Sequence, residues 1–117
     1  MIGNVYGSRF LQGTKTTLYF RNGLTHNKSL MVHCKSGNNK PQYLKPGGID
    51  YQFSFLDNLM QCTMKKGPDY KISKTFDAYK QEIGKRHGGS YNYLAKDDGI
   101  YHSNLAEPKL TKKFDWN

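Results

Sequence analysis

The sequence predicts an all-β fold, an antiparallel β-sandwich of about eight short strands that is immunoglobulin-like in architecture. Three observations support this prediction. Short segments alternate apolar and polar residues, as in Leu30-Met31-Val32-His33-Cys34, and a period of two is typical of a strand with one buried face. Turn-forming residues separate these segments at intervals of about 8–12 residues. No segment has a convincing helical period, and 79–85 is too short to change the fold class.

Eight segments carry the strand pattern, and turn-forming residues lie between them. The first is rich in β-branched and aromatic residues and ends at Asn22-Gly23, a dipeptide suited to tight turns. Asp97-Asp98-Gly99 joins the sixth and seventh segments as a hairpin. Residues 1–14 show no clear period, so we expect a loosely ordered arm there and one sandwich domain over 15–117. The predicted strands are 16–21, 30–36, 51–55, 60–64, 73–79, 91–96, 100–103 and 110–117.

The alternation also places both cysteines toward the interior. Cys34 shares a strand face with Leu30 and Val32. Cys62 falls at an apolar position of the strand 60–64. We therefore expect the two sulfurs to share one core with the aromatic side chains. This arrangement is compatible with two facing sheets that meet at a sulfur pair, and also with two separate buried thiols.

Composition restricts the size and the partners of the protein. A chain of 117 residues is one domain, and its formal net charge of +9 favours anionic partners. Nucleic acid, acidic polysaccharide, anionic lipid and an acidic receptor face all qualify; the alternative is a solvated, lysine-rich surface without a binding site. No apolar run approaches the ~20 residues of a membrane helix. No secretory hydrophobic region precedes the domain, which leaves a cytosolic protein or a secreted one whose signal peptide has been removed.

Six short elements occur in a distinctive order along the chain. They are Val32–Ser36, Leu44–Gly47, Tyr51–Phe55, Cys62, Phe76–Tyr79 and Asp98–Tyr101. In order and spacing they resemble the plant self-incompatibility S-protein family, the S-protein homologues, over roughly residues 16–101 and again at Trp116. The resemblance implies a small secreted β-sandwich that acts as an extracellular signalling ligand of a membrane receptor, without enzymatic activity or cofactor.

The chain departs from the family's pattern in three places. The family usually carries four cysteines, but the last two are missing here, and Tyr91 stands where one of them usually lies. Tyr93 corresponds to a Trp that is usual in the family, and the loop 37–41, often acidic in the family, is not acidic here. These departures imply a different disulfide set and a different charge toward the partner. We expect a disulfide between Cys34 and Cys62, because small secreted domains commonly need such a bond.

Candidate recognition residues follow from charge and from loop positions. Recognition residues concentrate in loops on a rigid sandwich, so we expect basic and polar loop residues to contact an acidic receptor face. The alternative is that these residues form solvated turns. Asn27-Lys28-Ser29 is an N-glycosylation acceptor sequence, and a glycan on Asn27 would lie at the surface. The expected contact residues are Asn38, Asn39, Lys40, Lys65, Lys66, Lys85 and Arg86.

Catalytic and metal sites are not predicted. His33 and Cys34 are adjacent in a strand, so they face opposite ways and cannot readily share one ion. Asp97-Asp98 is the only paired carboxylate, and it lies in a predicted turn, where Asp is favoured by bonds to the backbone. We expect a secreted, non-enzymatic monomer that binds a cell-surface receptor, neither binds nucleic acid nor inserts into a membrane, and has no signal peptide in this chain. The alternatives are a nucleic-acid-binding β-barrel and a secreted basic defence protein or toxin.

Overall fold

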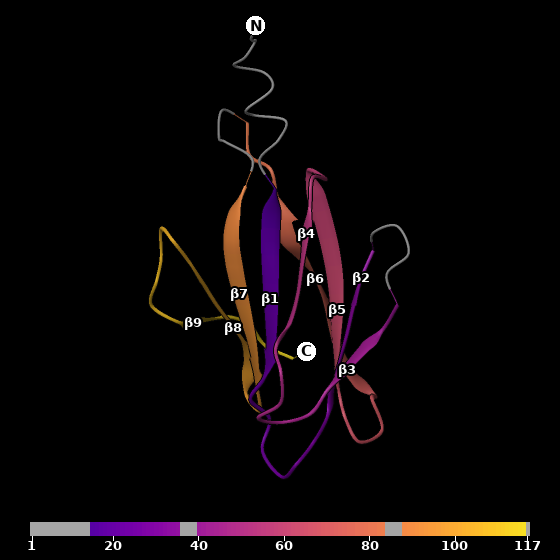
Figure 1. Ribbon diagram of the computed structural model, residues 1–117. Coiled ribbons are helices and arrows are strands. Elements are labelled where there is room, and N and C mark those ends of the chain that lie inside the picture. Colours follow the sequence, from indigo (N-terminus) through magenta and orange to yellow (C-terminus); the bar gives the residue numbers. More distant parts are fainter. Residues whose placement is uncertain (1–14, 36–39, 84–87, 117) are drawn as a thin grey trace, which may run out of the picture.

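The protein consists of β-strands in two sheets, and the computed structural model describes residues 15–35, 40–83 and 88–116, in which no helix occurs. The predicted all-β sandwich is confirmed (Figure 1). The predicted N-terminal arm, residues 1–14, lies outside the described residues. The strands of the described part are β1 (Thr16–Asn22), β2 (Leu30–Cys34), β3 (Gln42–Leu44), β4 (Tyr51–Phe55), β5 (Leu59–Lys66), β6 (Ile72–Lys80), β7 (Gly89–Lys96), β8 (Gly99–Asn104) and β9 (Thr111–Phe114).

The larger sheet has the strand order β4-β1-β7-β8-β9. β1 pairs antiparallel with β4 but parallel with β7, and this parallel pair aligns Phe20 with Tyr93. The sandwich is therefore not antiparallel throughout. Parallel neighbours are joined by long connections rather than tight turns, so the turn-forming residues in the sequence could not indicate this pairing. The predicted hairpin through Asp97 and Asp98 is confirmed as the β7–β8 connection.

The smaller sheet has the order β3-β2-β5-β6 and is antiparallel at every pairing. β3 has only three residues and was not predicted, because so short a segment shows no measurable period. Its pairing of Leu44 with Leu30 extends the sheet beyond β2. β5 also reaches further than predicted, to Lys66, because β2 supplies Leu30 and Met31 as partners for its last two residues.

The core lies between the two sheets and is largely aromatic. Phe20 stacks on Tyr51, Phe53 and Tyr93, with ring centroids 6.1, 6.4 and 5.7 Å apart. These separations lie within the range of favourable ring contacts. Across the sheets, the Tyr93 hydroxyl donates a hydrogen bond of 2.5 Å to the carbonyl oxygen of Ala78, and burial raises the pKa of Tyr93. The predicted inward face of β2, Leu30, Val32 and Cys34, is at most 2% exposed.

A bulge interrupts the pairing of β5 with β6. Met60 pairs with Tyr79 but Gln61 pairs with Asp77, so Ala78 has no partner in the register. The extra residue breaks the period of two, and consecutive Ala78 and Tyr79 are both buried. An uninterrupted alternation would have placed Ala78 and Tyr79 on opposite faces.

The C-terminal segment closes one end of the sandwich. β9 confirms the predicted last strand, and it pairs with β8. Trp116 is buried beyond it, and its indole Nε1 donates a 2.7 Å hydrogen bond to the carbonyl oxygen of Lys96. Lys66 Nζ lies 5.1 Å from the centre of the Trp116 ring and donates to the carbonyl oxygen of Asp97 at 3.1 Å. The last residue of β5 is thereby tied to the β7–β8 hairpin of the other sheet.

Candidate recognition surface

A disulfide joins Cys34 and Cys62, whose sulfur atoms are 2.04 Å apart. The two residues are direct partners in the register of β2 and β5, so the bond links neighbouring strands of one sheet. It does not bridge the two facing sheets, which was one of the two arrangements compatible with the sequence pattern. Both cysteines are buried in the core, which confirms their predicted face. The bond fixes β2 against β5, the two central strands of the smaller sheet.

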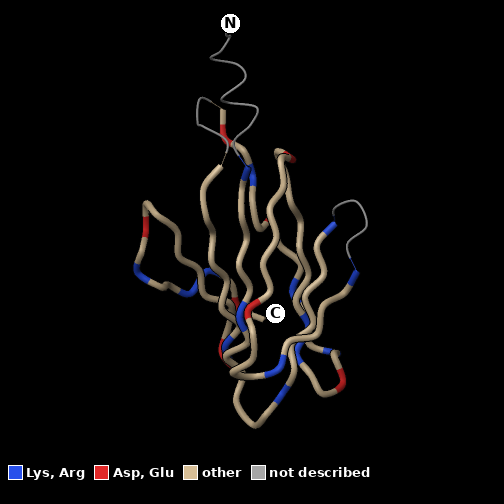
Figure 2. The backbone as a smooth tube through the Cα atoms, in the orientation of Figure 1, with Lys and Arg blue, Asp and Glu red and all other residues tan. Residues whose placement is uncertain are grey.

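The predicted contact residues fall into three groups. Lys40 is exposed in the loop before β3, as expected. Lys65 and Lys66 are the last residues of β5 rather than loop residues, and they point to opposite faces: Lys65 outward and Lys66 toward Trp116. The remaining four lie outside the described residues: Asn38, Asn39, Lys85 and Arg86. Figure 2 shows the Lys and Arg residues of the described chain spread over several turns and strands instead of massed at one place.

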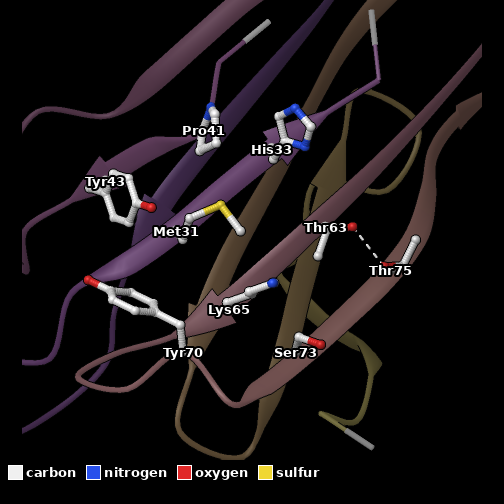
Figure 3. A pocket seen from close by; sticks show the side chains of 9 residues that line it. All are labelled: Met31, His33, Pro41, Tyr43, Thr63, Lys65, Tyr70, Ser73 and Thr75. Carbon is white, nitrogen blue, oxygen red and sulfur yellow. Dashed lines mark hydrogen bonds between the residues drawn. The ribbon is translucent and has the colours of Figure 1, made fainter.

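A hollow of about 520 Å³ opens on the outer face of the smaller sheet (Figure 3). Alternate outward positions of neighbouring strands form its floor, because the register sets Met31 opposite both Tyr43 and Lys65, and Thr63 opposite Thr75. The hydroxyls of Thr63 and Thr75 are hydrogen-bonded at 2.7 Å. The lining residues are Met31, His33, Pro41, Tyr43, Thr63, Lys65, Tyr70, Ser73 and Thr75.

Two tyrosines form one end of this hollow. Tyr43 and Tyr70 meet edge to face with centroids 5.5 Å apart, and Met31, which is buried outside the main core, lies beside them (Figure 3). Tyr70 has a positive φ of 59°, which is unusual for a bulky residue and costs about 1 kcal/mol or more. Two bonds hold it there: its amide donates to the Lys66 carbonyl at 3.0 Å, and its hydroxyl is bonded to that of Ser29. The sequence alone did not identify this surface, although apolar Met31 at an outward position was a usable signal.

The predicted glycosylation site lies in the turn between β1 and β2. Asn27 is exposed and, like its neighbour His26, has a positive φ, at 57°. Asn tolerates this left-handed conformation better than most residues. The hydroxyl of Ser29, the third residue of the acceptor sequence, contacts Tyr70 in a partly buried position. Glycosylation of Asn27 remains a prediction.

The paired carboxylates of the β7–β8 turn are used structurally. The pKa of Asp97 is lowered, chiefly because the Thr25 hydroxyl donates a hydrogen bond to its carboxylate and the Thr25 amide donates a second at 3.2 Å. Asp98 accepts from the Tyr101 hydroxyl at 2.8 Å, and this bond raises the pKa of Tyr101. The predicted turn at Asp97 and Asp98 is confirmed. Of the expected bonds to the backbone, Asp97 makes one, to the Thr25 amide of another turn, whereas Asp98 bonds to the Tyr101 side chain.

His102 lies inside β8 and is buried, whereas the sequence analysis gave it no role. Its ring packs against Tyr93 and Tyr91, with centroids 4.8 and 6.1 Å away. The side-chain amide of Asn104 lies 3.2 Å from its Nε2. Burial lowers the pKa of His102, and the positive charge of Lys113 lowers it further. His102 lies two positions after the apolar residue Ile100, and positions two apart in a strand face the same side, so the sequence indicated an inward side chain.

Within the described ranges, no group of three or more His, Cys, Asp and Glu side chains is arranged to hold a metal ion. The same residues contain no helical segment with the length and hydropathy of a membrane span. His33 stands on the outer face of β2 and Cys34 on the inner face, as their adjacency requires.

Comparison with solved structures finds the same fold in a plant protein. That protein is a self-incompatibility protein homologue, described as one of a widespread family of small, highly stable, secreted proteins from plants. The superposition has a TM-score of 0.66 and covers 87% of this chain and 96% of the other, at 24% sequence identity. At this identity the likeness establishes the fold.

Sequence comparison establishes the family. S-protein homolog 21 of Arabidopsis thaliana is 41% identical in an alignment of 125 positions, gaps included, that covers 97% of this chain and 88% of the relative. S-protein homolog 9 of the same plant is 36% identical over 107 residues, covering 86% and 80%. The family described as plant self-incompatibility protein S1 matches residues 17–116. The chain therefore belongs to the plant self-incompatibility S1 family, the S-protein homologues.

Proposed function

We propose that this chain acts outside the cell as a non-enzymatic signalling ligand that a membrane receptor recognises. The observation that carries the proposal is the buried Cys34–Cys62 disulfide at the centre of a small, cationic sandwich. Disulfides persist in oxidising, extracellular compartments, and small secreted domains depend on them. The described secretion of the structurally similar homologue supports the same location.

Basic residues that face outward support an acidic contact face on the receptor. Lys40 in the loop before β3 and Lys65 at the end of β5 are the described candidates. Asn38, Asn39, Lys85 and Arg86 are further candidates from the sequence. Lys66 is less suited to contact a partner, because Trp116 and the Asp97 carbonyl already engage its ammonium group. Complementary charges of this kind act mainly on the association rate.

The two carboxylates of the β7–β8 turn and the buried histidine make structural contacts, which is consistent with a signalling role that needs no catalysis in this domain. Asp97 bonds to Thr25 in the connection between β1 and β2, and Asp98 bonds to Tyr101 in β8. The buried His102 packs between tyrosines. Tyr79, Tyr91 and Tyr93 contact the core or one another, so these three rings are not arranged to stack on nucleic-acid bases.

The proposal can be tested by capture on intact plant cells. The oxidised protein, carrying a tag and a photo-crosslinker, is applied to cells, and captured membrane proteins are identified by mass spectrometry. We expect saturable capture of a membrane protein that unlabelled protein displaces. Capture that does not saturate, or that equally charged lysozyme displaces as well, would contradict receptor recognition.

Charge reversal then locates the contact. Lys40→Glu should slow association with the captured receptor several-fold and reduce its dependence on salt. The matched control is Lys109→Glu, which makes the same charge change at another exposed position, in the β8–β9 connection. Equal effects of the two variants would show that only net charge matters.

A further inference from the structure

We propose that the outer face of the β3-β2-β5-β6 sheet binds an acidic oligosaccharide, a chain of pyranose rings that carry carboxylates, in the hollow around Lys65. This proposal goes beyond receptor recognition and does not rest on it, although Lys65 is a candidate residue for both contacts. Three features of the lining residues carry the inference: their charge, their aromatic rings and their hydroxyl groups (Figure 3).

The charge of the hollow selects an anion. None of the nine described residues that line it is acidic, while Lys65 contributes an ammonium group and His33 an imidazole. Among the described residues no carboxylate pairs with Lys65, so its charge is available to a ligand. A carboxylate bound there would gain a charge-assisted hydrogen bond, which is stronger than a bond between neutral groups.

The two tyrosines provide rings at one end of the hollow. Tyr43 is 62% exposed, although it lies in a strand, and its ring is supported at the edge by Tyr70. The unusual backbone conformation of Tyr70 is held by bonds to Lys66 and Ser29, and such conformations cluster at functional sites. The rings are thus positioned before any ligand binds, which lowers the entropic cost of binding. The C–H face of a pyranose ring packs well on an exposed aromatic ring of this kind.

The remaining lining residues match the hydroxyl groups of a sugar. Thr63, Thr75 and Ser73 present three hydroxyls side by side on β5 and β6, and Tyr43 adds a phenolic hydroxyl. The Tyr70 hydroxyl is already bonded to that of Ser29. A volume of about 520 Å³ lies within the range of sites for small ligands. Two other occupants fit this lining less well. A lipid acyl chain would require a more apolar lining, and a protein partner would require the apolar centre that is typical of protein interfaces.

The experiment uses the intact, oxidised protein and defined probes. Binding of an α-linked oligogalacturonate is measured by titration calorimetry, with the fully methyl-esterified oligomer of equal length as the neutral probe. We expect the acidic oligomer to bind and the ester to bind at least about tenfold more weakly, since it cannot form the charge-assisted bond. Equal affinity for the two oligomers would overturn the role of Lys65.

Paired variants distinguish binding in this hollow from non-specific attraction of an acidic oligosaccharide to a basic protein. Lys65→Gln and Tyr43→Ala should each weaken binding about fivefold or more. Their controls are Lys109→Gln, with the same loss of charge, and Tyr19→Ala, at a partly exposed position on the other sheet. Thermal unfolding confirms that each variant is folded. Equal weakening by variants and controls overturns the proposal. The absence of oligogalacturonate binding, combined with loss of cell-surface capture in Tyr43→Ala, would assign this face to the receptor instead.

Discussion

Reduction of the Cys34–Cys62 bond should destabilise the protein by an amount that the structure sets. The chain contains two cysteines in total, so a reductant acts on this bond alone. Reduction also keeps both sulfur atoms in the core, unlike substitution, and therefore isolates the effect of the cross-link from the effect of a cavity.

The magnitude follows from the length of the loop that the bond closes. A sequence separation of 28 residues corresponds to about 3.6 kcal/mol at 25 °C when the bond acts by restricting the unfolded chain. A chain of 117 residues has an unfolding entropy of about 0.25 kcal/mol/K, so the same loss lowers Tm by about 14 °C. The unfolded reduced chain is also more expanded, and its denaturant m-value should rise.

Guanidinium unfolding followed by circular dichroism, with and without reductant, measures both quantities. The control is the double variant Cys34→Ala, Cys62→Ala, whose stability should not respond to the reductant. A loss of less than about 1 kcal/mol with an unchanged m-value would refute the reasoning, because the bond would then not be restricting the unfolded chain.

Three further predictions concern the core and its edges. Tyr93→Phe should cost about 1–3 kcal/mol in urea unfolding, because the buried carbonyl of Ala78 loses its donor; a neutral result would mean that water replaces it. The folded-state pKa of His102 is lowered, so the unfolded chain binds more protons below the ordinary value of 6.5, and stability should fall as pH drops below that value. His102→Phe should flatten this part of the stability curve, and an unchanged slope would exclude the histidine as its source. Gly99→Ala places a Cβ atom 2.6 Å from the carbonyl oxygen of Phe114, so we expect a loss of about 1–3 kcal/mol and faster hydrogen exchange in β9; native-like exchange there would contradict the contact.

Local patterns were sufficient to predict most strands but not their arrangement. β4 was predicted at its observed bounds, Tyr51–Phe55, because alternation and turn residues define both of its ends. The parallel pairing of β1 with β7 depends on contacts between distant segments, which no local period encodes. β3 exists because β2 offers it a partner. β5 continues past its predicted end at residue 64 to Lys66, since pairing with β2 outweighs the weak strand preference of Lys.

The candidate surface was harder to predict for a related reason. Recognition residues were expected in loops, whereas the hollow is built mainly from outward positions on four strands that come together only through the register. Met31 and Lys65 are far apart in sequence and opposite each other in the sheet. The positive φ of Tyr70 has no signature in its residue type, because bulky residues rarely adopt it.

Strands β2 and β5 carry both the disulfide and a part of the proposed oligosaccharide-binding hollow. β2 and β5 are linked at Cys34 and Cys62, and the next pair in the register, His33 and Thr63, faces outward into the hollow. A bond that prevents β2 from sliding against β5 therefore also fixes the spacing between the groups that would contact a ligand, and a site that is already ordered loses less entropy on binding. Alternation confines each position to one side of the sheet. A substitution at an outward position such as Lys65 can thus change what this face binds while the disulfide and the core beneath it stay intact.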